Sequence, residues 1–391
     1  MRGRELGCYA VIVALLQLGC VAPARAQTTT PYASISTEVE SYAGPGRASA
    51  NDLTGQVVRI GLLAPLQGAR KAEGEAMIAA AQMALRDTAS QRLSRRRVAL
   101  AVEDSSGSTW GMVSDAVIRL MLNDESIAVI TSTSRADAHL CEQVGNRIGV
   151  PVLTLSADAT TTQIDIPWIF RMGPSDAAEA QVIAQDMYSV RKLHNVLLIT
   201  QHDREGDRAA QEMKQAALGL GAPAPHVISL DEAPLDPGSI VRAIQSESPQ
   251  AIVIWTSPTT AAILLRALQI AGVKTICYLS QNASSEMHDA STSESTASET
   301  WTIAGNDEPT GTRQSFADRF RRSTGTAPTL VASQTYDAVI LTVHALQTAG
   351  PNRARVRDEI AKANQYDGVS GKISFDCEGN DRAALHLVQL K

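Results

Sequence analysis

Short apolar runs recur along the chain, and each is followed by a polar or small-residue loop and then by a stretch with helical character. Apolar runs of about four to eight residues are typical of strands buried on both faces, and their alternation with helices is typical of βαβ units. The pattern therefore predicts an α/β protein built on parallel sheets. The runs are Val57–Leu63, Val98–Val102, Ile127–Ile130, Pro151–Leu155, Val196–Ile199 and Ala251–Trp255.

The clearest helical periodicity lies between Val113 and Met121, where apolar residues follow an i, i+3, i+4, i+7 and i+8 pattern. We expect six further helices, at Glu75–Leu85, Ala177–Val190, Arg208–Gly219, Ala261–Gly272, Thr312–Thr324 and Thr335–Thr348. Three more strands are expected at Ile276–Leu279, Gly368–Phe375 and Leu385–Leu390. The elements form two series that meet near Pro174, which suggests two similar lobes.

The N-terminus has the features of an export signal. Arg2 and Arg4 precede an apolar stretch from Tyr9 to Leu18, and Ala24-Arg25-Ala26 is a typical cleavage site. We therefore expect a signal peptide over residues 1–26 and a periplasmic or other extracytoplasmic location. Acylation of Cys20, as in a bacterial lipoprotein, is the alternative end to the signal. Residues 27–55 are rich in Thr, Ser, Ala, Gly and Pro, and we expect them to be a flexible leader.

Composition narrows the classes of function. The net charge is −6, the chain has no basic block, and aromatic residues make up only 4% of it, which argues against a nucleic-acid partner. No recognisable catalytic motif is present, and the seven histidines lack metal-ligand spacing. We expect no enzymatic activity, cofactor or metal. Cys277 and Cys377 are either a disulfide pair or free thiols, a choice that sequence leaves open.

Several segments, in this order, resemble the type I periplasmic solute-binding proteins of the leucine/isoleucine/valine-binding class. The resemblance covers about residues 56–385 and implies two Rossmann-like lobes with parallel sheets, joined by a three-strand hinge. It places residues 56–177 and 306–363 in the N-terminal lobe, and residues 178–305 and 364–391 in the C-terminal lobe. The matching segments are Ile60–Gly68, Glu103-Asp104, Gly149–Leu153, Ser156–Thr160, Phe170-Arg171, Pro174–Asp176, Tyr336–Val339 and Gly368–Phe375.

In that family, loops of the first lobe hold the carboxylate and ammonium of an amino acid, and the second lobe closes over it. The resemblance implies that Ser132, Ser134 and Arg135 are donors to the carboxylate and that Ser156 and Asp158 lie in a second loop beside the ligand. Each residue also has a structural alternative. The serines could cap the next helix, Arg135 could point into solvent, and Asp158 could form an Asx-turn.

Elsewhere the sequence departs from the family. Glu73 and Glu205 stand where aromatic residues are usual, and Gln281 stands where an acidic residue is often found. Trp255 ends a strand and is a candidate for stacking on the ligand, with a role in the core as the alternative. Ser257 in the following loop is a weaker candidate. Either the ligand is more polar or cationic than an aliphatic amino acid, or the cleft no longer binds amino acids; a solvated surface charge is the default for any single Glu.

These observations predict a solute-binding protein that captures a small polar solute, an amino acid or an amide-like compound. Its partners would be that small-molecule ligand and a membrane ABC permease. The alternative is a ligand-sensing or envelope interaction protein on the same fold, with no role in transport.

Overall fold

The computed structural model describes residues 41–89, 96–107, 110–162, 167–231, 235–285, 299–305 and 311–390. The predicted signal peptide and Cys20 lie outside the described residues, as does most of the Ser-rich stretch after Ser285. No helix in the described part of the chain is long and apolar enough to cross a membrane.

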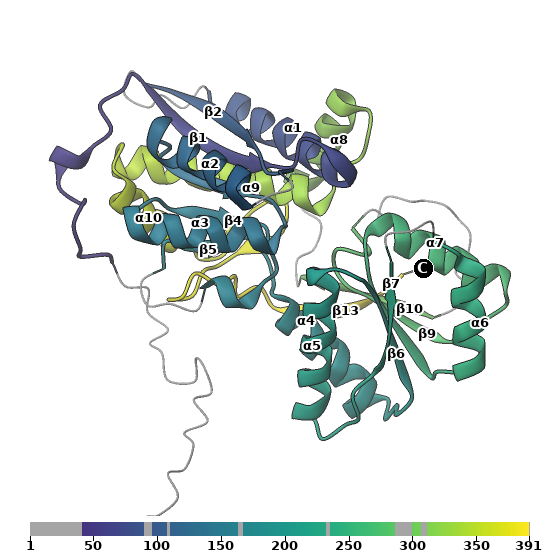
Figure 1. Cartoon of the computed structure of the whole chain (residues 1–391). Helices are drawn as coiled ribbons and strands as arrows, with labels where there is room; N and C mark the ends of the chain where they lie inside the picture. Colours follow the sequence, from purple (N-terminus) through teal and green to yellow (C-terminus); the bar gives the residue numbers. More distant parts are fainter. Residues whose placement is uncertain are drawn as a thin grey trace, which may run out of the picture. The chain divides into compact units, whose positions relative to one another are not determined.

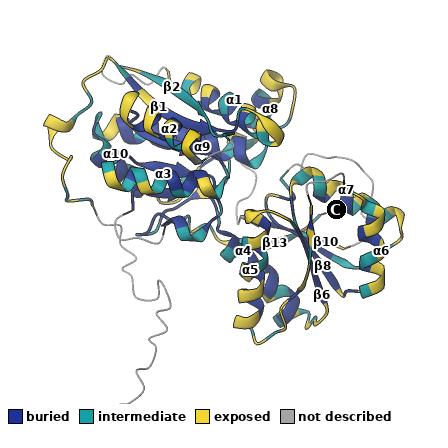
Figure 2. Ribbon diagram, viewed as in Figure 1, coloured by how far each residue is buried: buried dark blue, intermediate teal, exposed yellow. Residues whose placement is uncertain are grey.

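The first sheet has five parallel strands in the order β2-β1-β3-β4-β5. Ile60 in the central strand β1 pairs with Leu100 on one side and with Ala128 on the other. Figure 2 shows the inner strands in dark blue, because their apolar side chains are buried. The strands are β1 Val57–Ala64, β2 Arg97–Asp104, β3 Ala128–Thr131, β4 Val152–Thr154 and β5 Ile169–Arg171.

Helices from two distant parts of the chain pack on this sheet. The late helices α8 and α9 lie beside α1 (Figure 1), and buried side chains of α9 such as Val339 join the same core as Leu62 and Phe170. The first lobe is therefore discontinuous in sequence. Its helices are α1 Lys71–Thr88, α2 Trp110–Ile118, α3 Arg135–Ile148, α8 Gly311–Thr324, α9 Leu330–Ala349 and α10 Arg353–Ala361.

The second sheet has six strands in the order β13-β10-β9-β8-β6-β7. All neighbours are parallel except β13, which runs antiparallel to β10. Two apolar cores form, one with Ile183 and Met213 and the other with Ile240 and Leu264. The strands are β6 Val196–Gln201, β7 His226–Leu230, β8 Ala251–Trp255, β9 Ile276–Leu279, β10 Thr300–Gly305 and β13 Leu385–Leu390. The helices are α4 Asp176–Ala184, α5 Arg204–Gly219, α6 Pro237–Glu247 and α7 Pro258–Ile270.

This architecture confirms the predicted fold class, α/β with parallel sheets in two lobes. Strands β8, β9 and β13 have the predicted bounds. The strand expected at Gly368–Phe375 is wrong in extent: β12 is only Lys372–Ile373 and pairs with β11, Tyr366–Asp367. The cause is Asp337, whose carboxylate accepts the N–H groups of Val369 and Ser370 at 2.9 and 2.7 Å and holds them in a turn.

Other elements were not expected from the sequence. Strand β5 is buried but has only three residues, which is shorter than the expected apolar runs of about four to eight. Strand β7 is an edge strand with an exposed His226 and Val227, so it lacks the expected apolar pattern. Helices α6 and α10 were also unexpected. No disulfide joins Cys277 and Cys377, so the disulfide alternative is not formed.

The described part of the expected leader is bound to the first lobe. Asp358 of α10 accepts the Tyr42 N–H at 3.0 Å and forms an ion pair with Arg47. Arg355 reaches Asp52 at 2.8 Å. Residues 41–53 are therefore held against α10 as a strap, contrary to the expectation of a flexible leader through residue 55, because their charged and backbone groups have partners on that helix.

Candidate functional site

The ends of β3 and β4 place two loops side by side. Parallel strands present their carboxyl ends at one edge of a sheet, where ligands of open α/β sheets bind. Here the buried Thr131 hydroxyl donates to the Thr154 hydroxyl at 2.8 Å. The loop with Ser132, Ser134 and Arg135 therefore lies next to the loop with Ser156 and Asp158.

Ser132 and Ser134 both take part in the start of α3. The Ser132 hydroxyl donates to an oxygen of Asp137 at 2.7 Å and accepts the Ser134 N–H at 3.1 Å. The Ser134 hydroxyl accepts the Asp137 N–H at 3.3 Å as the N-cap of the helix. The capping alternative thus describes Ser134, and both hydroxyls already have partners within the chain.

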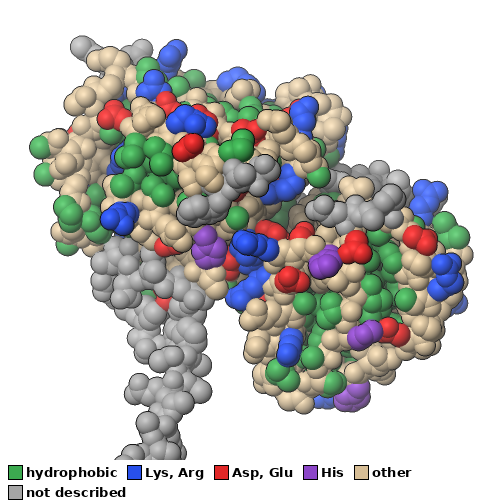
Figure 3. Space-filling model, viewed as in Figure 1, with side chains coloured by type: hydrophobic (Ala, Val, Ile, Leu, Met, Phe, Trp, Pro, Cys, Tyr) green, Lys and Arg blue, Asp and Glu red, His purple; other side chains and the backbone are tan. Residues whose placement is uncertain are grey.

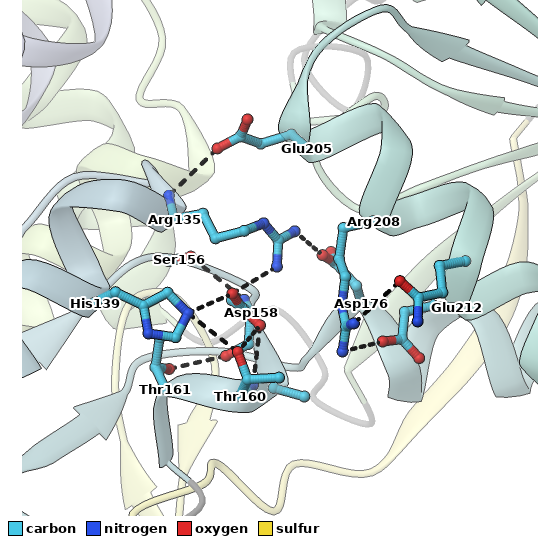
Figure 4. A network of polar contacts seen from close by, with 12 residues as sticks. Arg135, His139, Ser156, Asp158, Thr160, Thr161, Asp176, Glu205, Arg208 and Glu212 are labelled. Atoms are coloured by element: carbon cyan, nitrogen blue, oxygen red, sulfur yellow. Dashed lines mark hydrogen bonds and ion pairs between the residues drawn. The ribbon is translucent and has the colours of Figure 1, made fainter.

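Arg135 does not point freely into solvent. Its side chain is 13% exposed, Nη1 lies 2.8 Å from Asp158 Oδ2, and Nη2 donates to Asp176 Oδ2 at 2.8 Å (Figure 4). Burial opposes the charged form, but Asp176 and Asp158 prevail and raise the pKa of Arg135. The guanidinium is therefore held by two carboxyl groups of the chain itself.

Both carboxylate oxygens of Asp158 have partners within the chain. Its Oδ1 accepts the Thr160 N–H at 2.9 Å and the Thr160 hydroxyl at 2.7 Å, which is an Asx-turn, and its Oδ2 lies 3.0 Å from His139 Nε2. Burial opposes ionisation, yet these hydrogen bonds and Arg135 hold the pKa of Asp158 well below its usual range. Ser156 supports the loop by accepting the Asp158 N–H at 3.3 Å.

Glu73 connects the loop after β1 with the loop after β3. Its Oε1 accepts the Thr133 N–H at 3.0 Å, the Thr133 hydroxyl at 2.9 Å and Arg70 Nη2 at 2.7 Å. Its Oε2 accepts Arg70 Nε at 2.8 Å. Glu73 is 17% exposed, so it is not the solvated surface charge that is the default for a lone Glu.

Two glycines bring the helices bearing Glu73 and Glu205 close to the strand ends. A Cβ at Gly74 would lie 1.9 Å from the Pro65 carbonyl oxygen, and one at Gly206 would lie 1.9 Å from the Gln201 carbonyl oxygen. Only glycine permits these approaches. Each glutamate is thereby fixed in the first turn of its helix, at the carboxyl edge of its sheet.

The candidate residues of the second lobe differ in which lobe they contact. Glu205 in α5 accepts the backbone N–H of Arg135 at 3.3 Å and so joins the group in the first lobe. Trp255 packs against a core of the second lobe, and Ser257 caps α7 by accepting the Thr260 N–H at 3.2 Å. The Gln281 N–H donates to the buried Glu179 of α4 at 2.9 Å.

Sequence reasoning missed several members of this group. Arg70, Thr133 and His139 complete the contacts of Glu73 and Asp158, and Asp176 completes those of Arg135. Arg208 and Glu212 form an ion pair at 2.6 Å beside them (Figure 4). The i, i+3 spacing of Arg70 and Glu73 was a signal for the first pair, whereas Asp176 belongs to the family-matching segment Pro174–Asp176, which by itself implied no contact with Arg135.

Carboxyl groups outnumber guanidinium groups at this edge. Figure 3 shows acidic, basic and histidine side chains gathered there. The carboxyl groups are Glu73, Asp158, Asp176, Glu205 and Glu212, and the guanidinium groups are Arg70, Arg135 and Arg208. The excess of negative charge favours a cationic group over an anionic one.

A cavity of about 540 Å³ lies elsewhere, against α1 and the loop before α9. Ala72, Phe320, Thr326 and Ser285 are among the residues that line it, and the ten residues proposed from the sequence are not.

The sequence model of the periplasmic binding protein family matches residues 57–390. A leucine-binding protein of Thermotoga maritima is 17% identical, covers 85% of this chain and 95% of its own, and has a TM-score of 0.71. A solute-binding protein of Rhodopseudomonas palustris, in complex with 3,4-dihydroxybenzoic acid, is 15% identical with coverages of 86% and 94% and a TM-score of 0.73.

A putative branched-chain amino acid ABC transporter protein of Rhodospirillum rubrum is 23% identical, with coverages of 86% and 98% and a TM-score of 0.64. None of the curated proteins compared with this chain matches it. At these identities the solved structures show the fold, and they confirm the resemblance to the type I class. Because the family match spans most of the chain, the protein belongs to the periplasmic binding protein family.

Proposed function

We propose that the protein is an extracytoplasmic solute-binding protein that captures a small polar solute, an amino acid or an amide-like compound, and delivers it to a membrane ABC permease. The observation that carries this proposal is the polar group at the carboxyl edge of the first sheet, which Glu205 of the second lobe joins through the Arg135 N–H. The family's fold, shared with substrate-binding proteins of ABC transporters, supports it. The proposal contains no catalytic step.

Binding would work by hinge closure around the solute. In the proposal, the loops with Ser132, Ser134 and Ser156 line one side. Glu205, Trp255, Ser257 and Gln281 come from the other side. Arg135 and Asp158 lie at the centre, where each already has charged partners, so the solute must either fit beside them or exchange with them.

The charge at the edge supports a cationic or zwitterionic solute. Structural neighbours include one complex with isoleucine and one with benzoate, so this fold alone does not decide the sign of the ligand charge. Five carboxyl groups against three guanidinium groups favour a solute that carries positive charge.

A specific observation also favours the second candidate, a ligand-sensing or envelope interaction protein. Glu73 and Arg135 are each held by partners within the chain. Side chains that already have partners within the chain are suited to keeping a fixed arrangement for a protein partner as well as to binding a solute.

A thermal-shift screen of the chain against amino acids, amides, polyamines and small carboxylates tests the proposal. A ligand at about 1,000 times its Kd should add roughly 4 kcal/mol to the free energy of unfolding, an easily measured rise in Tm. Glu205→Gln should reduce the shift, whereas the control Glu247→Gln, at an exposed pair with His226, should leave it unchanged. A flat screen with folded protein would favour the interaction-protein candidate.

A further inference from the structure

We propose that the chain's own carboxylates occupy the carboxylate-binding positions of this site, so that the solute is an amine or amidine-type cation without a carboxylate. The inference rests on the proposed capture of a small polar solute, and it replaces the amino acid by an amine as the class of ligand. Two sets of donors are occupied in this way. Glu73 accepts hydrogen bonds from Thr133. Asp158 and Asp176 form ion pairs with Arg135.

The first set of donors has the chemistry of a carboxylate site. A backbone N–H and a hydroxyl, both from Thr133, and the guanidinium of Arg70 converge on Glu73 Oε1 within 2.7–3.0 Å. Arg70 also reaches Oε2 through its Nε at 2.8 Å. Paired guanidinium contacts with a backbone donor are among the strongest ways to bind a carboxylate. Glu73 takes this position from within the chain.

The second set is Arg135. Its two terminal nitrogens each lie 2.8 Å from a carboxyl oxygen, one of Asp158 and one of Asp176, and both of these residues are buried. A solute carboxylate that took Arg135 would leave two buried carboxyl groups without their cation. Removing one partner of a buried ion pair is strongly unfavourable because the other charge stays desolvated.

A solute carboxylate that took the Thr133 and Arg70 donors, or Arg135 Nη2, would therefore have to displace a carboxylate that already makes the same contacts. An ammonium or amidinium group faces no such exchange. The exposed carboxylate of Glu205 makes one long contact, 3.3 Å, to the Arg135 N–H, and so retains acceptor capacity for a cation. The excess of carboxyl groups at the edge also favours a cationic solute over one with a carboxylate.

Pairs of ligands that differ only in the carboxylate test this on the unmodified chain. Agmatine with arginine, cadaverine with lysine, and putrescine with ornithine should be compared by calorimetry and thermal shift. We expect at least one amine to bind at least tenfold more tightly than its amino acid, a difference of about 1.4 kcal/mol. Amino acids that bind as tightly as their amines would overturn the inference and leave solute binding intact. If neither these pairs nor the wider panel binds, the proposed function itself fails.

Glu73→Ala should reduce or abolish the preference for the amine. It leaves the Thr133 donors and Arg70 without their carboxylate, so affinity for arginine should rise at least tenfold while affinity for agmatine changes less. The control is Glu75→Ala on the same helix, where an exposed ion pair with Lys71 is lost and the ligand preference should not change. If Glu73→Ala does not fold, Glu73→Gln keeps the shape and removes the charge. An unchanged preference in a folded Glu73 variant would contradict the inference.

Discussion

Glu179 carries a carboxyl group into the interior of the second lobe. It is 5% exposed, and its one backbone partner is the Gln281 N–H at 2.9 Å. Burial, with a smaller contribution from the nearby Asp176, raises the pKa of Glu179 to about 8, although the hydrogen bond from Gln281 opposes this. The carboxyl group is therefore protonated in the folded protein at pH values where an unfolded chain would have lost that proton.

This shift makes stability depend on pH. Because the folded pKa of Glu179 lies above the unfolded value of 4.5, its contribution is fully present below pH 4.5 and is lost as pH rises through about 8. Glu179→Gln should thus match the parent near pH 4.5 and exceed its free energy of unfolding near pH 8.5, by at most roughly 5 kcal/mol. Urea unfolding at both pH values measures this.

The control for that experiment is Glu75→Gln, whose side chain is 63% exposed and should give no such pH-dependent difference. Burial raises the pKa of Asp337 to about 6, so Asp337 also makes the free energy of unfolding fall as pH rises. Because Asp337 is present in every variant compared, its effect cancels. Equal pH profiles for Glu179→Gln and the parent would show that Glu179 is ionised in the folded state.

At the scale of elements, the strap over residues 41–53 and helix α10 form one unit at the amino end of the first sheet. The ring of Tyr42 contacts Trp168 just before β5, and the Leu53 N–H donates to the Pro351 carbonyl oxygen at 2.8 Å. The candidate site lies at the opposite end of these strands, since β1 spans eight residues, about 26 Å at roughly 3.3 Å each. The strap therefore stabilises the lobe without approaching the site.

Asp358→Ala should destabilise the protein strongly. Asp358 is 3% exposed and pairs with Arg47 and with Arg357, which is itself buried, so the substitution leaves a buried guanidinium without its carboxylate. The expected loss is about 3–5 kcal/mol in urea unfolding. Trypsin should also cleave after Arg47 faster in the variant.

The matched control is Asp124→Ala, which removes a partly exposed partner 4.0 Å from the exposed Arg59. Exposed ion pairs contribute about 0–1 kcal/mol, so this variant should behave nearly as the parent. Rapid cleavage after Arg47 in the parent protein would mean that the strap does not bind α10 in solution.

At the scale of the whole molecule, the chain returns to each lobe after visiting the other. The return into the second sheet runs through Tyr366–Ile373, where Asp337 of α9 holds Val369 and Ser370. The Ser370 hydroxyl also donates to Asp337, at 2.6 Å. This buried carboxyl group thus fixes the connecting segment to the first lobe.

Gly368→Ala should disturb that attachment. A Cβ at this position would lie 2.5 Å from Asp337 Oδ2 and 2.9 Å from the Gly371 carbonyl oxygen, so the turn must shift. We expect a loss of about 1–3 kcal/mol, typical of overpacking, with faster amide exchange at residues 369 and 370. Gly219→Ala, where a Cβ meets no neighbour within 4 Å, should be neutral or slightly stabilising. Unchanged exchange at these amides would contradict the proposed anchoring.

Much of this fold could be predicted because buried parallel strands leave a strong apolar pattern, as in Ala251–Trp255. Elements without that pattern could not: β7 is exposed at an edge, and Asp337 rather than local preference limits β12. At the site, the family resemblance placed Arg135 and Asp158 in two loops beside the same ligand. It did not show that they pair with each other, because the contacts join residues 23 to 41 positions apart and depend on how the loops meet.

The interleaved order of the two lobes has a consequence for biosynthesis. The first core needs Val339 and Phe375, and the second sheet needs β13, Leu385–Leu390, yet the ribosome makes these segments last. Neither lobe can complete its core while most of the chain is being translated. A nascent chain of this kind stays incompletely folded until synthesis is nearly over, which is the condition that a translocase handling unfolded polypeptides requires.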